Sequence, residues 1–178
     1  MRIDAEENRV RMIAAARDLI AESGPGVPMA RVARRAGVGV ATLYRRFPTR
    51  DDLVAEAYAD QHAECSASWL EAARDPDPAR AFRETIRRLC ATQVVDRGYT
   101  TAVLAGHGMA AERAEYDRAL TTLLDRAREA GALRPGIGVG DLWLLLAGNA
   151  GVIAAAGPGA AAASGRFVEH VLRSFSGG

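Results

Sequence analysis

The spacing of apolar residues limits the fold of this sequence more than any other feature. Apolar residues return roughly every three or four positions, the period of an α-helix, along most of the chain. Val10, Ile13 and Ile20, for example, would lie on one face of a helix over residues 4–22. No stretch shows the alternation of polar and apolar residues that predicts a strand. The sequence therefore predicts an all-α fold.

Clusters of Gly and Pro divide this pattern into about nine helices. Pro28 suits the first position of the second helix, because its missing N–H needs no partner there, and Gly37 suits its end. Thr49 is the predicted N-cap of the fourth helix. The predicted helices span residues 4–22, 29–36, 40–47, 50–74, 78–96, 100–106, 109–131, 139–156 and 160–175.

Charge is divided unevenly along the chain. The net charge is +1, yet residues 1–50 carry ten arginines and five acids, whereas residues 51–178 carry thirteen arginines and seventeen acids. Between Ser23 and Arg50 there are six arginines and no acid to offset them. A basic end of this kind suggests contact with a polyanion, and a solvated helix face is the alternative reading.

The basic segment has the layout of a helix-turn-helix. A short helix over residues 29–36 is followed by a glycine turn and a second short helix over residues 40–47. Leu43 and Phe47, four residues apart, should face inward and hold the second helix in place. Such a helix is narrow enough to enter the major groove of DNA.

Side chains of the second helix suit contact with DNA. Thr42 and the hydroxyl of Tyr44 can hydrogen-bond phosphate, and Arg45 and Arg46 can pair with phosphate or guanine. Arg50 offers the same chemistry at the start of the fourth helix, where backbone N–H groups also attract phosphate. Which of Arg45 and Arg46 reads bases stays open.

Three stretches resemble the DNA-binding region of the TetR family of bacterial transcriptional repressors. They are "RMIAAARDLIAESG" for its first helix, "PMARVARRAGV" for its second, and "GVGVATLYRRFPTRDDLV" for its recognition helix and the start of the fourth. The resemblance covers roughly residues 8–58. It implies a DNA-binding domain over residues 1–50 and a helical effector-binding and dimerisation domain over residues 51–178.

The resemblance also implies which positions meet DNA. Gly39, Val40, Ala41 and Thr42 match positions that approach bases, where the small apolar Val40 and Ala41 can contact thymine methyl groups. Phosphate and base-edge contacts fall on Tyr44, Arg45, Arg46 and Arg50. The family often has Ser or Thr at the start of helix 2, but Pro28 and Met29 stand here, so that contact is not implied.

Apolar residues with a few polar neighbours in the middle helices could line an effector pocket. Taken singly, each of them fits an ordinary core position better than a pocket wall. The candidates are Phe82, Ile86, Leu89, Cys90, Tyr99, Leu104, His107, Tyr116, Leu120, Trp143 and Asn149.

The last two helices are the predicted dimer interface. The run Leu142–Gly157 is apolar nearly all round, and residues 167–175 carry a matching stripe, although a central helix of a monomer would read similarly. The run is shorter than the roughly 18–20 residues that span a bilayer and contains Asn149, so no membrane partner is expected.

The chain shows no sign of catalytic chemistry. Cys65 and Cys90 lack metal-ligand spacing with the three histidines, and there is no nucleophile–base pair and no phosphate loop. With no N-terminal signal peptide visible, we expect a cytoplasmic protein without a metal or cofactor.

Together these features predict a repressor that binds a pseudo-palindromic operator as a homodimer and is released by a small, largely apolar effector. Two alternatives stay open. One is a DNA-binding regulator without a small-molecule inducer, and the other is a ligand carrier or enzyme that keeps a helix-turn-helix shape.

Overall fold

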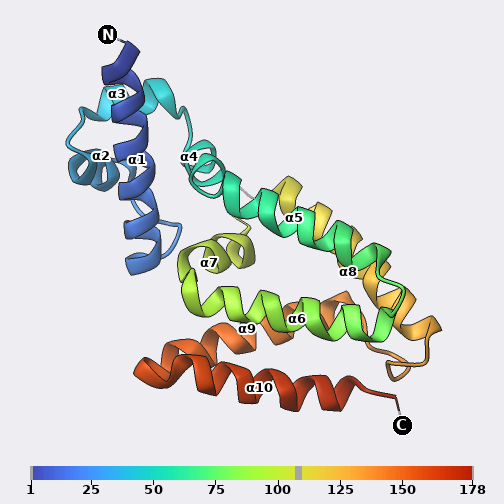
Figure 1. Cartoon of the computed structure of the whole chain (residues 1–178). Helices are drawn as coiled ribbons and strands as arrows, with labels where there is room; N and C mark the ends of the chain where they lie inside the picture. The colour runs from blue at the N-terminus through green and yellow to red at the C-terminus, as the bar shows by residue number, and fades with distance from the viewer. Residues whose placement is uncertain (1, 107–109, 178) are drawn as a thin grey trace. The chain divides into compact units, whose positions relative to one another are not determined.

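The structure is a computed structural model that describes residues 2–106 and 110–177, and it is almost entirely helical (Figure 1). Within these residues, ten α-helices and one short 3₁₀ turn are joined by brief loops, and the only β-type pairing is an isolated bridge between Leu133 and Ser176. The predicted all-α fold is confirmed. The elements are α1 (Arg2–Ser23), α2 (Met29–Ala36), α3 (Val40–Arg46), α4 (Arg50–Ala57), α5 (Ala59–Arg74), α6 (Pro78–Val95), α7 (Arg97–Ala105), α8 (Ala110–Glu129), α9 (Val139–Ala156), η1 (Gly157–Gly159) and α10 (Ala160–Phe175).

The predicted helix over residues 50–74 is wrong in one respect, because it is divided at Tyr58 into α4 and α5. Arg17 of α1 donates from Nε to the carbonyl oxygen of Ala57 at 2.5 Å, so the end of α4 has a partner outside its own helix. The Tyr58 ring is buried and lies 5.5 Å, between centroids, from the ring of Tyr99. Tertiary packing therefore breaks this helix at a point where the sequence has neither Gly nor Pro.

Gly98 was expected to lie in a break before a helix over residues 100–106, but it lies inside α7. A Cβ atom at Gly98 would stand 2.3 Å from the hydroxyl oxygen of Tyr58. This glycine is therefore explained by the close approach of the Tyr58 side chain, and the break is limited to Asp96.

One compact unit comprises residues 1–62 and 98–113. Helix α1 packs on α2 and α4, and α2 packs on α3. Its core takes apolar residues from each of these helices: Met12, Ala16, Leu19, Ile20, Val32, Ala33, Ala36, Leu43, Phe47, Leu53, Val54 and Ala57. Val32, Ala33 and Ala36 form the buried face of α2.

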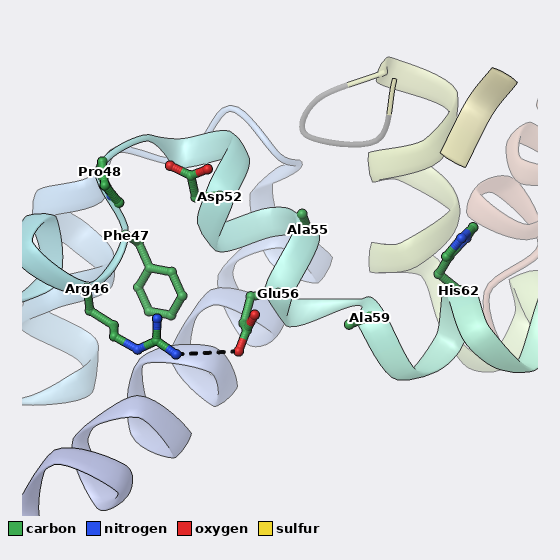
Figure 2. Close-up of a pocket in the computed structure, with 8 residues that line it drawn as sticks. All are labelled: Arg46, Phe47, Pro48, Asp52, Ala55, Glu56, Ala59 and His62. Atoms are coloured by element: carbon green, nitrogen blue, oxygen red, sulfur yellow. Dashed lines mark ion pairs between the residues drawn. The ribbon is translucent and has the colours of Figure 1, made fainter. Parts of the chain in front are cut away.

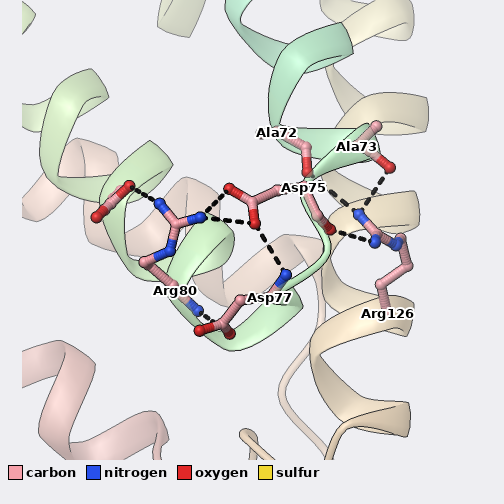
Figure 3. Close-up of polar contacts among 7 residues, drawn as sticks. Ala72, Ala73, Asp75, Asp77, Arg80 and Arg126 are labelled. Carbon is pink, nitrogen blue, oxygen red and sulfur yellow. Dashed lines mark hydrogen bonds and ion pairs between the residues drawn. The ribbon is translucent and has the colours of Figure 1, made fainter.

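The second compact unit comprises residues 63–97 and 114–178. Here α10 packs against both α9 and α6, and α6 also packs on α9. At the corner between α5 and α6, Arg80 pairs with Asp75 at 2.8 Å (Figure 3). Arg126 of α8 donates to the carbonyl oxygens of Ala72, Ala73 and Asp75 at the end of α5, at 2.6–3.2 Å (Figure 3). These contacts satisfy carbonyls that a helix end leaves without partners.

The stretch from α9 to α10 is long and apolar enough to cross a membrane by length and composition, with a mean hydropathy of 1.6 in its most apolar part. Core helices of soluble proteins can have the same length and composition. Because Gly157–Gly159 divides the stretch and α9 packs against α10, these are two neighbouring helices.

Candidate nucleic-acid interface

Helix α3 is fixed by apolar side chains on its inner face and by glycines at its start. Leu43 and Phe47 are 0% and 2% exposed, which confirms the prediction that both face inward. Gly37 ends α2 with φ at 67°, a left-handed conformation that glycine adopts most easily. Gly39 is the N-cap of α3 in an extended conformation. This turn and these two anchors leave the opposite face of α3 uncovered.

The uncovered face of α3 holds most of the predicted base-contacting residues. Val40 and Tyr44 are 42% and 47% exposed, which is unusual for large apolar and aromatic side chains. Ala41 and Arg45 are exposed beside them, and Thr42 is half-buried. Five predicted residues are thus presented together by one rigid helix.

Thr42 and Arg45 form a small polar pair on this face. Arg45 donates from Nη2 to Thr42 Oγ1 at 2.9 Å. The Thr42 oxygen acts as an acceptor in this bond, so its hydroxyl hydrogen stays available for a phosphate oxygen. The pair also fixes the direction of the Arg45 side chain along α3.

Arg46 points toward α4 and borders an open groove. Its Nη2 lies 3.8 Å from Glu56 Oε1, and its guanidinium lies over the Phe47 ring, 5.2 Å from the centroid (Figure 2). The groove has a volume of roughly 560 Å³ and is lined by Arg46, Phe47, Pro48, Asp52, Ala55, Glu56, Ala59 and His62. Sequence reasoning missed Glu56, because an acid ten residues from Arg46 gives no local signal.

Arg50 begins α4 and is half-buried, with a buried Nε atom that has no hydrogen-bond partner. The start of α4 is capped as predicted, since Thr49 Oγ1 accepts from the Asp52 N–H at 3.1 Å. Asp52 in turn accepts from the Thr49 N–H at 2.9 Å. This carboxylate already occupies part of the helix start, so backbone attraction for phosphate there is weaker than the sequence suggested.

The expectation that no acid offsets the arginines of residues 23–50 is wrong, because an acid from outside this segment lies next to two of them in the folded chain. Glu22, just outside that segment, accepts from Arg35 at 2.5 Å and lies 3.4 Å from Arg31. The hydrogen bond to Glu22 raises the pKa of Arg35 above its usual value. Two of the arginines of α2 are therefore partly neutralised by α1.

Comparisons with known proteins agree with this geometry. The model of the tetR family of bacterial regulatory proteins matches residues 12–57, and the model of the C-terminal domain of SbtR-like transcriptional regulators matches residues 77–174. The chain belongs to the TetR family. A crystal structure of a TetR transcriptional regulator from Streptomyces coelicolor is 33% identical, with 95% of this chain and 98% of that chain covered and a TM-score of 0.60.

Two further comparisons support less, because one covers a short segment and the other has low sequence identity. A helix-turn-helix transcriptional regulator from Staphylococcus aureus is 44% identical over 54 residues, and the match spans 30% of this chain and only 29% of that protein. The regulator FadR from Bacillus subtilis, solved in complex with stearoyl-CoA, has a TM-score of 0.68 at 14% identity, with 92% of this chain and 97% of that chain covered. At that identity the likeness concerns the fold alone.

The effector candidates of this TetR-family chain fall into different groups. Phe82, Ile86, Cys90, Tyr116, Leu120 and Asn149 are buried in the second unit, and Leu89 and Trp143 are half-buried there. Tyr99 and Leu104 belong to the first unit. His107 lies outside the described residues. The structure thus brings eight of the candidates into one unit.

Two buried polar atoms in the second unit have no hydrogen-bond partner. Asn149 is fully buried, and its Nδ2 donates to Gln93 Oε1 at 2.7 Å, yet its Oδ1 is unpaired. Trp69, packed 5.9 Å from Tyr116 between ring centroids, has an unpaired indole N–H. Sequence reasoning missed Trp69 and Gln93, although a tryptophan on an amphipathic helix was a usable signal.

Other candidate side chains are already engaged. The Trp143 indole N–H donates to Asp117 Oδ1 at 2.6 Å. Burial raises the pKa of Cys90 to about 12, so its thiol stays protonated and unreactive at neutral pH. Cys90 also borders an apolar groove of roughly 500 Å³ between α6 and α10. Among the described residues no group of three or more His, Cys, Asp or Glu could hold a metal ion.

Proposed function

We propose that this chain is a homodimeric DNA-binding repressor that recognises a pseudo-palindromic operator and is released by a small, largely apolar effector. The observation that carries the proposal is the outer face of α3. Val40 and Tyr44 are large, exposed side chains on a seven-residue helix that is otherwise anchored in the core. Neighbouring exposed apolar and aromatic side chains on one helix face are typical of an interaction surface.

Each residue of this face has a role in the proposal. Val40 and Ala41 contact thymine methyl groups, while Thr42 and Tyr44 donate to phosphate. Arg45, in the last turn of α3, binds either a guanine edge or a phosphate. Arg46 and Arg50, on the side toward α4, bind phosphate. Gly39 has no side chain, so the backbone at the start of α3 can approach the bases closely.

The dimer is formed by α9 and α10 of two copies. Leu144 is 71% exposed on α9, and Ala147, Gly148 and Gly151 are exposed along the same helix. Small residues allow close approach of a second copy, and an exposed leucine gains from burial. Two-fold symmetry then presents two α3 helices to half-sites about 34–36 Å apart, or a multiple of that distance.

The effector binds within residues 78–156. Its body is apolar, to match the buried aromatic and aliphatic side chains of α6 and α8, and it bears a polar group that complements the unpaired Asn149 Oδ1. That FadR was solved with stearoyl-CoA supports an apolar ligand only by analogy of fold. The chain acts in the cytoplasm, where it meets DNA.

A salt series of DNA affinities tests this function. The purified protein is titrated, by fluorescence anisotropy, with the DNA upstream of its own gene and with a scrambled duplex. We expect preferential binding to one palindromic segment, and affinity that falls steeply with salt. Tyr44→Phe, Arg45→Ala and Arg46→Ala should each weaken binding, and a lost phosphate contact reduces the salt slope by about one. Equal affinity of wild type and all three variants would refute the assignment of α3.

A further inference from the structure

Glu56 of α4 links the recognition helix to α1. It accepts from Arg9 Nε at 2.9 Å and, with the same oxygen, from Arg9 Nη2. The same oxygen lies 3.8 Å from Arg46 Nη2, which is an ion-pair distance without a hydrogen bond (Figure 2). One carboxylate therefore attracts two arginines, but it binds only Arg9 closely.

This asymmetry makes Arg46 easy to release. Its side chain is 50% exposed, whereas those of Arg9 and Glu56 are 31% and 32% exposed. Arg46 rests on the Phe47 ring, a contact that draws its guanidinium toward α4. When Arg46 leaves, Glu56 still has Arg9 as a partner, so no acid is left uncompensated.

We propose that Glu56 is a positioning residue that holds Arg46 away from DNA in the free protein, and that operator binding exchanges Glu56 for a backbone phosphate as the partner of Arg46. This inference rests on the proposed DNA binding by α3. Glu56 lowers the affinity for every DNA sequence, because the contact that it competes with is a phosphate contact that carries no sequence information. Its effect is to lower operator affinity and non-specific affinity alike.

The expected gain on removing the carboxylate is modest. Half-exposed ion pairs are weak, so Glu56→Gln should raise the affinity for DNA about threefold per subunit, or about tenfold for two subunits on one operator. The gain should be similar on operator and scrambled duplex, and should shrink as salt screens the pair.

Glu6→Gln is the matched control. Glu6 also pairs with Arg9, at 2.9 Å, and its replacement changes the charge of the same unit by the same amount. It touches Arg9 but not Arg46. We expect DNA affinity within about twofold of wild type for Glu6→Gln, within the range typical of such exposed pairs. An equal gain in Glu6→Gln and Glu56→Gln would overturn the inference, because net charge would then explain both.

A double-mutant cycle and an opposite-sign variant complete the test. In an Arg46→Gln background, Glu56→Gln should give no gain. Arg9→Gln leaves Glu56 with Arg46 alone, so it should weaken DNA binding, and this loss should also vanish with Arg46→Gln. Arg9→Gln keeps the test decisive if thermal unfolding shows that Glu56→Gln does not fold.

The outcomes separate the inference from the proposed function. A wild-type protein that binds no DNA sinks both. A wild type that binds its operator, with Arg46→Gln weaker but Glu56→Gln unchanged, overturns only the role of Glu56.

Discussion

Replacing Gly98 by Ala should destabilise the protein, and the sign of the effect should reverse when the Tyr58 hydroxyl is removed. The added Cβ would lie 2.3 Å from Tyr58 Oη, a distance that the folded chain cannot keep. Overpacking of this kind costs about 1–3 kcal/mol. Alanine is better than glycine within a helix by about 1 kcal/mol, which offsets part of that cost. Gly98→Ala alone should therefore lower the free energy of unfolding by up to about 2 kcal/mol.

In a Tyr58→Phe background the same change should stabilise. The next atoms that the Cβ meets are Tyr58 Cζ and the Ala21 nitrogen, both at 3.4 Å, which is an ordinary contact. Only the helix-propensity gain then remains, about 0.5–1 kcal/mol. Urea unfolding followed by circular dichroism, at one fixed protein concentration, gives the four free energies of the cycle. An equal loss in both backgrounds would refute the steric reasoning.

Two further predictions concern the second unit. Leu144→Arg should convert a dimer to a monomer in light scattering at micromolar concentration. The control Leu70→Arg, at a leucine that is 59% exposed on α5, should leave the mass unchanged. A wild-type protein that is already a monomer would exclude the proposed interface. Arg87 donates to Glu169 at 2.6 and 3.1 Å and lowers the pKa of Glu169, so this pair contributes stability above the ordinary glutamate pKa and loses it as pH falls through the lowered value. Glu169→Gln should therefore cost at most about 1 kcal/mol at pH 7 and progressively less as pH falls through the lowered pKa of Glu169, and a difference that stays constant as the pH is lowered would contradict this cause.

The helical periods and the capping signals made most of the fold predictable. The caps of two helices are local patterns that do not depend on distant residues. They are Thr49 with Asp52 at the start of α4 and Gly37 after Ala36 at the end of α2. The break at Tyr58 has no such pattern, because it depends on Arg17, forty residues earlier, reaching the Ala57 carbonyl. The sequence wrongly places Gly98 between two helices for a related reason. The residue that explains this glycine, Tyr58, packs against it in the fold but is distant in sequence.

The candidate sites were predictable to different degrees. The outward face of α3 follows from the positions of Leu43 and Phe47. Once these two residues are buried, the helical period fixes the directions of the other side chains. In the second unit α9 is apolar nearly all round, and on the amphipathic helices α6 and α8 core and pocket residues share one apolar face, so the sequence pattern does not separate them. What distinguishes Asn149 there is an oxygen without a partner, and that is a property of packing.

The arginines of residues 23–50 show why charge counted along a sequence differs from charge in space. Among the described residues, Arg31 and Arg35 share Glu22 and Arg46 faces Glu56, whereas Arg45 contacts only Thr42. An arginine that leaves an acid to bind phosphate still displaces counterions from DNA, but salt also weakens the ion pair that it gives up, so its contribution to the salt slope is reduced. Its contribution to affinity is smaller, since the ion pair that it had is lost. The structure therefore predicts a salt dependence and an affinity for DNA that are both below what the arginine count suggests. Because phosphate contacts carry no sequence information, the reduction is the same for operator and scrambled DNA, and discrimination between them depends on the proposed base contacts of α3.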